Sequence, residues 1–236
     1  MISPAFVSNL EKLNCELLDT YIILYDDKIS QTSDFIDIIQ KVHATGKPLF
    51  IIARDVEQDA LATLVVNREK ANLKCCVIKS PGFGDTRRDM LDDLAAAVGG
   101  RVFDNQNKRA LRDAELEDLG TARRIVCNRN NTMILDGGGS SEVLTARINL
   151  IKTQMSDPLI FDHQKTTLKE RLTKLSGGAA IIRVGGTTES EMRERKDRIE
   201  DSVNAVRAAI EMGVVPGGGS ALLQASKVIG DFITSK

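Results

Sequence analysis

Residues 21–53 read YIILYDDKISQTSDFIDIIQKVHATGKPLFIIA, and this stretch decides the fold class of the chain. It begins and ends with short, continuous apolar runs, at residues 21–25 and 49–53, which are typical of strands buried on both faces. Between them, apolar residues at helical spacing predict a helix that Ser33 or Asp34 caps and Gly46 ends. A strand, a helix and a strand with short connections predict an α/β domain with a largely parallel sheet.

The same pattern continues along the chain. Residues 75–78 predict a third strand, and the apolar residues before them predict a helix that Asp55 caps. A third helix should begin at an Asp85 cap and end at Gly99-Gly100. Turn residues 129–131 then separate two β-like runs, residues 124–128 and 132–135, which predicts a hairpin.

The last third of the sequence looks mainly helical. Helices are expected from about Ser141, and around Leu168, Leu172 and Leu175, with Gly177-Gly178 as the cap of the second. A strand over 179–184 should follow. A long charged helix from Thr188 to Met212 carries one narrow apolar stripe and ends at Gly213. We place domain boundaries near Gly177-Gly178 and near Gly213.

The composition excludes several classes of protein. Among 236 residues, 32 Lys and Arg balance 33 Asp and Glu, which argues against a general nucleic-acid binder. No apolar run approaches the ~20 residues that cross a bilayer, so no membrane contact is expected. The four cysteines lack metal-ligand spacing and are interpreted as buried thiols of a reducing compartment.

Two of the predicted helices carry more apolar residues than one buried face needs. In the first, Phe35, Ile38 and Val42 share a face, while Ile36 and Ile39 lie about 100° round. In the second, Ala60 and Leu64 form one pair and Leu61 and Val65 another. Periodicity leaves two interpretations open, a wide core face or an exposed apolar groove that binds another protein.

Glycine-rich turns and one carboxylate are further candidates. The turns at residues 81–85 and 137–139 lack the partners of a phosphate loop, and a tight turn is favoured. The glycines at 217–219 precede a helix, so an anion site and a plain turn both remain open. Asp201 lies about 200° from the apolar stripe of its helix. It is either a solvated acid, with Arg198 as a possible partner, or a carboxylate that orients water toward a phosphate or a magnesium ion.

Five stretches closely resemble the group I chaperonins, the bacterial GroEL and organellar heat-shock family, in the order and spacing of that family. They are ARDVEQDALATLVVN at 53–67, KSPGFGD at 79–85, LEDLG at 116–120, LTKLSGG at 172–178 and GVVPGGG at 213–219. The resemblance covers essentially the whole chain. It implies a molecular chaperone that binds non-native polypeptides and assists their folding, driven by ATP in the complete ring.

The resemblance also implies a division into domains. Residues 1–178 correspond to an apical domain, a β/β/α swivelling domain that binds substrate and co-chaperonin. Residues 179–212 correspond to the C-terminal limb of the intermediate hinge domain, with its long helix. Residues 213–236 correspond to the start of the equatorial ATP-binding domain. On this basis we expect the chain to be a fragment of a larger subunit, from a bacterial cytoplasm or an organelle matrix.

The apical groove of the family maps onto a defined set of apolar residues. They are Phe6, Ile36, Ile39, Leu61, Val65 and Val66. The implied partners are non-native polypeptides, a GroES-type co-chaperonin lid ring that competes for the groove, and sister subunits in a double ring of sevens. Met1, Ala5, Arg54 and Gln58 depart from the usual residues of the family, which should alter substrate affinity.

The resemblance assigns a nucleotide role to three more residues. Asp201 would position the attacking water and Mg, and Gly217 and Gly218 would approach ATP in the complete subunit. The Gly-Asp-Gly-Thr-Thr-Thr loop of the family is absent from this sequence. Because catalysis needs those phosphate and magnesium contacts too, we expect the chain alone to bind no cofactor and to hydrolyse no ATP. The alternative to a segment of an ATP-driven machine is a stand-alone module that holds unfolded chains.

Overall fold

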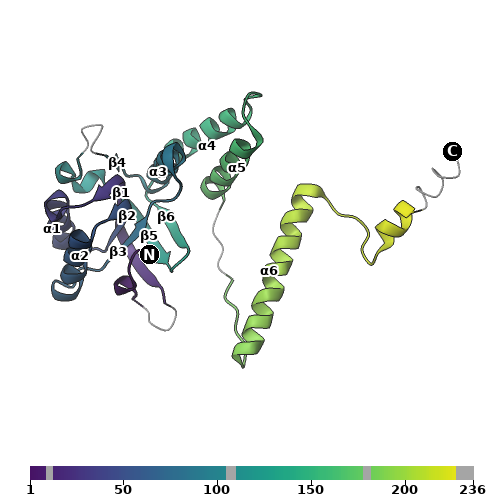
Figure 1. Cartoon of the computed structure of the whole chain (residues 1–236), viewed down its shortest axis with the longest axis horizontal. Helices are drawn as coiled ribbons and strands as arrows, with labels where there is room; N and C mark the ends of the chain where they lie inside the picture. Colours follow the sequence, from purple (N-terminus) through teal and green to yellow (C-terminus); the bar gives the residue numbers. More distant parts are fainter. Residues whose placement is uncertain (9–12, 105–109, 178–181, 227–236) are drawn as a thin grey trace. The chain divides into compact units, whose positions relative to one another are not determined.

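The computed structural model describes residues 1–8, 13–104, 110–177 and 182–226. The chain divides into two compact units, Met1–Ala179 and Ala180–Lys236. The first contains the β-sheet and the second contains a long helix, α6 (Figure 1). Each unit is therefore described by itself, and the functional assignment of the domains stays a prediction.

The first unit is built on a mixed sheet of six strands among the described residues. The strands are β1 (Cys15–Ile29), β2 (Leu49–Val56), β3 (Cys75–Lys79), β4 (Val102–Phe103), β5 (Gly120–Cys127) and β6 (Thr132–Gly137). Their order is β3-β2-β1-β5-β6, and β4 pairs with the end of β1. The three predicted apolar strands are parallel, with Tyr21 opposite Leu49 and Leu49 opposite Cys75. The predicted hairpin is confirmed as the antiparallel pair β5 and β6.

Helices cover both faces of the sheet. Helices α1 (Ile36–Thr45) and α2 (Gln58–Lys70) connect β1, β2 and β3 in one direction across the sheet. Helix α3 (Gly84–Val98) returns the chain from β3 to β4, on the far side of β1. Because such crossovers are right-handed, α1 and α2 lie on one face and α3 on the other, as Figure 1 shows. The mixed α/β architecture agrees with the expected fold class.

A helical hairpin and four short turns complete the described part of the first unit. Helices α4 (Ser141–Met155) and α5 (Asp162–Ser176) contact each other and pack against α3. Single 3₁₀ turns are found at η1 (Pro4–Phe6), η2 (Thr32–Asp34), η3 (Leu111–Asp113) and η4 (Leu116–Asp118). The core is aliphatic and centres on β1 and β2, where residues 22–25 and 49–53 are buried. The continuous apolar runs of the sequence are thus buried on both faces.

The helix ends were predicted better than the helix starts. Gly46 and Gly99 end α1 and α3 in the left-handed conformation, as expected. The predicted caps are wrong, because Phe35, Glu57 and Phe83 occupy the three N-cap positions without side-chain bonds. The Asp34 carboxylate is used inside η2, where it accepts from the Gln31 amide. Asp55 lies within β2, and Asp85 within the first turn of α3.

In the second unit, α6 (Glu189–Met212) confirms the predicted long helix. Thr188 caps it by accepting a hydrogen bond from the Glu191 amide at 3.2 Å. Residues 182–184 are not part of a strand, because no neighbouring strand pairs with them in the described part of this unit. The rest of that predicted strand and Gly178 lie outside the described residues. Gly177 ends α5 with an extended backbone rather than a left-handed one.

Candidate functional site

Helix α2 presents three different surfaces. Ala60 and Leu64 are fully buried against the sheet. Leu61 and Val65 are half-buried on one flank of the helix, and Val66 is 46% exposed on its outer side. The apolar character of α2 therefore extends beyond its buried face, although Leu61 and Val65 also pack against the core with part of their surface.

Helix α1 does not show the second, exposed apolar face that we expected. Phe35, Ile38 and Val42 are buried as predicted, but Ile39 is also buried, with 3% of its surface exposed. Only Ile36, in the first turn, is half-buried. The second stripe of α1 is thus mostly a wide core face, and the expected exposure of Ile39 is corrected. The turn η2 contacts both helices, and Thr32 Oγ1 lies 3.0 Å from Thr63 Oγ1 of α2.

The N-terminal segment, residues 1–8, lies along β3 and α2. The Ile2 amide donates to Val77 O of β3 at 2.9 Å. Phe6, which we expected in an exposed groove, is fully buried in the core. The aromatic ring anchors the segment, and it offers no surface to a ligand in this structure. Ile36, Leu61, Val65 and Val66, which we call the apolar strip, are the predicted groove residues that retain exposure.

One contact to this segment was missed by sequence reasoning. The Arg68 guanidinium donates through Nη1 to Ala5 O and through Nη2 to Val7 O, the latter at 2.8 Å. Arg68 follows Leu61 and Val65 at i+7 and i+3, so all three share one flank of α2. That spacing was visible in the sequence, but the main-chain acceptors more than 60 residues earlier in the chain were not.

A buried ionic cluster holds the helical hairpin to α3. Arg171 of α5 is 3% exposed and contacts Asp93 through Nε at 2.6 Å and Nη2 at 3.1 Å. Its Nη1 reaches Asp89 at 2.7 Å, and Arg147 of α4 donates to Asp93 through Nε at 2.6 Å. We call these four residues the α3 clamp. A cavity of about 420 Å³ lies beside the clamp, between α3, β6 and the end of α5.

The glycines at 137–139 pack closely rather than bind an anion. A Cβ on Gly139 would come within 3.0 Å of Ala97 O, and a Cβ on Gly137 would clash with the same carbonyl group. The Gly139 amide donates to Ala97 O at 3.1 Å. These residues therefore let the backbone after β6 lie directly against the end of α3. The turn at Gly82 and Gly84 is a tight turn with two left-handed glycines, as favoured.

The three candidate nucleotide residues lie in the second unit. Asp201 is exposed on α6, and Arg198 pairs with Glu194 instead of with Asp201. A Cβ on Gly217 or Gly218 would meet open space, so nothing approaches these glycines. In the described ranges of the chain, no three His, Cys, Asp or Glu side chains gather as ligands for a metal ion. The roles of Asp201, Gly217 and Gly218 toward ATP and magnesium therefore stay predictions.

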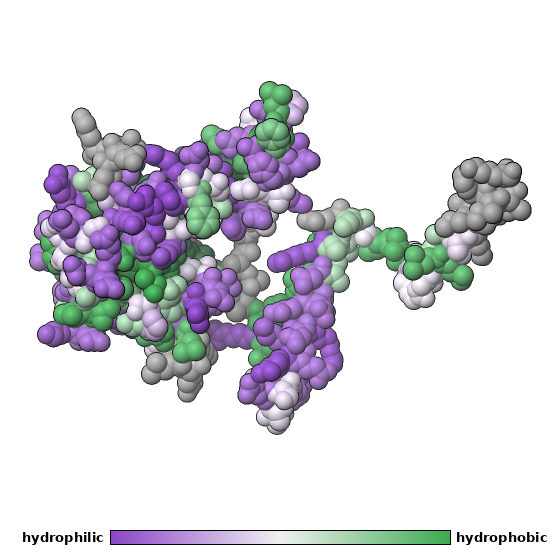
Figure 2. All heavy atoms as spheres, in the orientation of Figure 1, coloured by the Kyte–Doolittle hydropathy of each residue, from purple (hydrophilic) through white to green (hydrophobic). Residues whose placement is uncertain are grey.

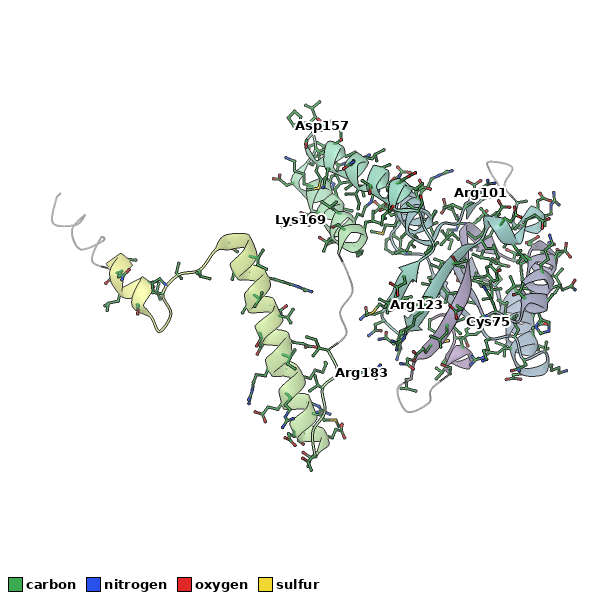
Figure 3. All side chains as sticks on the ribbon, turned by 180° about the vertical axis from the view of Figure 1, so that it is seen from behind. Cys75, Arg101, Arg123, Asp157, Lys169 and Arg183 are labelled. Carbon is green, nitrogen blue, oxygen red and sulfur yellow. The ribbon has the colours of Figure 1, made fainter. Side chains whose placement is uncertain are left out.

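The four cysteines are free thiols and are buried, as predicted. Cys75, labelled in Figure 3, lies on β3, and its Sγ is 3.8 Å from Leu64 O of α2. The Cys76 thiol, on the opposite face of β3, hydrogen-bonds the thiols of Cys15 and Cys127. The hydrogen bond with Cys76 lowers the pKa of the Cys127 thiol to about 6. Burial raises the pKa of the Cys75 thiol to about 12. Because reactive cysteines are partly exposed, the thiols are assigned to the core.

The surface of the two units differs in character. Figure 2 shows apolar patches on the first unit between larger hydrophilic areas. In the second unit, the segment after α6 is green in Figure 2, and Val214 and Leu222 are 83% and 79% exposed. In the described residues, no helix is long and apolar enough to span a membrane.

A comparison with protein-family models identifies the chain. Residues 28–236 match the model of the TCP-1/cpn60 chaperonin family. The matched range includes α1, α2 and the apolar strip, and it begins after the segment that Arg68 holds. Because the match covers far more than half of the sequence, the chain belongs to the TCP-1/cpn60 chaperonin family.

Proposed function

We propose that this chain binds non-native polypeptides through the apolar strip of α1 and α2. Membership of the chaperonin family implies a chaperone that assembles in rings and acts on unfolded proteins in general. The single observation that supports the site is the apolar flank of α2, which continues past its buried face through Leu61, Val65 and Val66.

An apolar strip suits clients that differ in sequence. Burying apolar surface contributes about 25 cal/mol per Å² and requires no particular side-chain order. Non-native chains expose such surface, whereas most of it is buried in folded monomers. One strip is small, so each site binds weakly, and several sites in one ring would bind the same client more tightly.

We further propose that residues 1–178 are the apical domain of a group I chaperonin subunit. A GroES-type lid would then compete with clients for the apolar strip. Phe6 and Ile39 would support the strip from the core rather than contact the client, since both are buried. The source compartment proposed with this assignment is a bacterial cytoplasm or an organelle matrix.

The test of the site is a double substitution on the exposed flank of α2. The Leu61→Glu/Val65→Glu variant should bind a fluorescein-labelled, reduced and carboxymethylated protein at least about tenfold more weakly, because two charges replace apolar contact surface. Fluorescence anisotropy measures the affinity, and circular dichroism checks the fold. Val143→Glu/Leu150→Glu is the matched control, since both residues are about half exposed on α4. Undiminished binding by the α2 variant would refute the site.

A second prediction concerns ATP. The family's Gly-Asp-Gly-Thr-Thr-Thr loop is absent from this sequence, and hydrolysis needs its phosphate and magnesium contacts. The purified chain with Mg-ATP should release phosphate at the rate of buffer alone, and the Asp201→Ala variant should behave identically. Phosphate release that depends on Asp201 would contradict this expectation. The alternative is a stand-alone module that holds unfolded chains, and the missing Gly-Asp-Gly-Thr-Thr-Thr loop supports it for this polypeptide by itself.

A further inference from the structure

The N-terminal segment is held by a polar anchor on α2, Arg68, and by an apolar anchor in the core, Phe6. Phe6 is fully buried, while the neighbouring Pro4 and Ala5 are exposed. The short turn η1 closes through the Val7 amide, which donates to Pro4 O at 3.0 Å. Arg68 then binds the main chain on both sides of Phe6, at Ala5 O and Val7 O. The segment is thus fixed at the end of the flank that carries Leu61 and Val65.

The chemistry of this contact depends on the guanidinium group. Its planar fork presents two N–H donors at once, and here they reach two carbonyl groups of the same short turn. A lysine ammonium is a point charge, and it would hold one of these carbonyls well but not both in the same geometry. Neither carbonyl belongs to a regular strand, so Arg68 supplies their hydrogen bonds in place of a sheet partner.

We propose that Arg68 is a positioning residue of the apolar strip. It fixes the main chain of residues 5–7, so that Ala5 and Val7, on either side of the buried Phe6, form the wall against which a bound client packs. The inference rests on the proposed function, and it assigns a role to a charged residue that does not itself supply apolar surface. The wall lies outside the range matched by the chaperonin family model, whereas Arg68 lies within it. Residues 5–7 are therefore a part of the site for which the family match gives no information.

The expected effect follows from the population of the positioned wall. When a binding-competent state is only partly populated, the apparent Kd rises in inverse proportion to its population. With both anchors in place the segment is held. Without the guanidinium, the segment keeps the buried Phe6 and the Ile2 hydrogen bond to β3, but the Ala5 and Val7 carbonyls lose their donor. We expect the positioned state to fall to between about a half and a tenth. The client affinity should then drop by about two- to tenfold.

The experiment compares three variants of the full chain with the labelled, carboxymethylated client. Arg68→Gln should weaken binding by about two- to tenfold, and Arg68→Lys should fall between Arg68→Gln and the original chain. Lys70→Gln is the matched control. It removes the same charge from the same last turn of α2, and Lys70 makes no ion pair among the described residues. Its affinity should be unchanged.

Two further measurements separate positioning from a purely structural role. Hydrogen exchange at the Val7 amide should be faster in Arg68→Gln than in Lys70→Gln. The urea midpoint for unfolding of the sheet should be the same in the two variants. If Arg68→Gln binds the client as tightly as Lys70→Gln, the proposal is overturned. Failure of the proposed function looks different, because Leu61→Glu/Val65→Glu would then bind the client undiminished. If Arg68→Gln does not fold, the client affinities of Arg68→Lys and Lys70→Gln decide. Weaker binding by Arg68→Lys supports the proposal, and equal binding by the two variants overturns it.

Discussion

Replacing Asp93 by alanine should destabilise the first unit by about 3–5 kcal/mol, the largest stability effect that we expect. Asp93 is the centre of the α3 clamp, since its two carboxylate oxygens accept from Arg171 and from Arg147. Removing one partner of a buried ionic contact costs more than the contact contributes, because the remaining charge stays buried and uncompensated. Among the described residues, Arg171 would keep Asp89 as its partner.

The consequence should be concentrated in the helical hairpin. Helices α4 and α5 each supply one arginine to Asp93, so losing the carboxylate weakens the attachment of both helices to α3. The contacts of Arg171 and Arg147 with Asp89 remain. Urea denaturation followed by circular dichroism measures the loss of stability, and hydrogen exchange over residues 141–176 locates it. Arg193→Ala is the control, because its pair with Glu189 on α6 is exposed and such pairs contribute little. A loss below about 1 kcal/mol would contradict the prediction.

The Gly139→Ala variant should lose about 3 kcal/mol, at the upper end of the usual range for overpacking. Its new Cβ would enter the space of the carbonyl groups of Ala96 and Ala97. Both carbonyls belong to the main chain of α3, so they cannot move aside as a flexible side chain would. The Gly139 hydrogen bond to Ala97 O would have to break or lengthen.

The measurement is again urea denaturation, with a matched glycine as control. Gly185→Ala is suitable, because a Cβ there meets nothing within 4 Å and the residue has no left-handed backbone. It should unfold like the original chain. Equal stability of the Gly139→Ala and Gly185→Ala variants would show that the backbone contact at the end of α3 is looser than the structure indicates.

Much of the fold was predictable because its signals are local. The apolar run at residues 21–25 and the alternation of strands with helices predicted the parallel part of the sheet. Gly46 and Gly99 predicted two helix ends, because the left-handed conformation that ends a helix favours glycine. The starts of α4 and α6 were predicted too, but the N-caps of α1, α2 and α3 were not. A side chain that could cap a helix can also bond within the preceding turn, as Asp34 does.

The candidate site was predictable only in part. The pairs on α2 predicted correctly that Leu61 and Val65 lie beside the buried face. The same argument on α1 failed for Ile39, and the resemblance gave no warning that Phe6 is buried. Arg68 escaped notice because its acceptors are main-chain carbonyls, which every residue possesses and no sequence pattern marks.

The amino-acid sequence by itself determined the α/β class, the long helix α6 and the resemblance to chaperonins, since periodicity, glycine positions and matching segments are all local. Only the tertiary structure decided which apolar faces are covered. It brought Cys76 to Cys127, Arg171 to Asp93 across 78 residues, and Arg68 to the carbonyl groups around Phe6. The physical reason is that periodicity shows which side chains share a face, but what covers that face depends on segments distant in the chain.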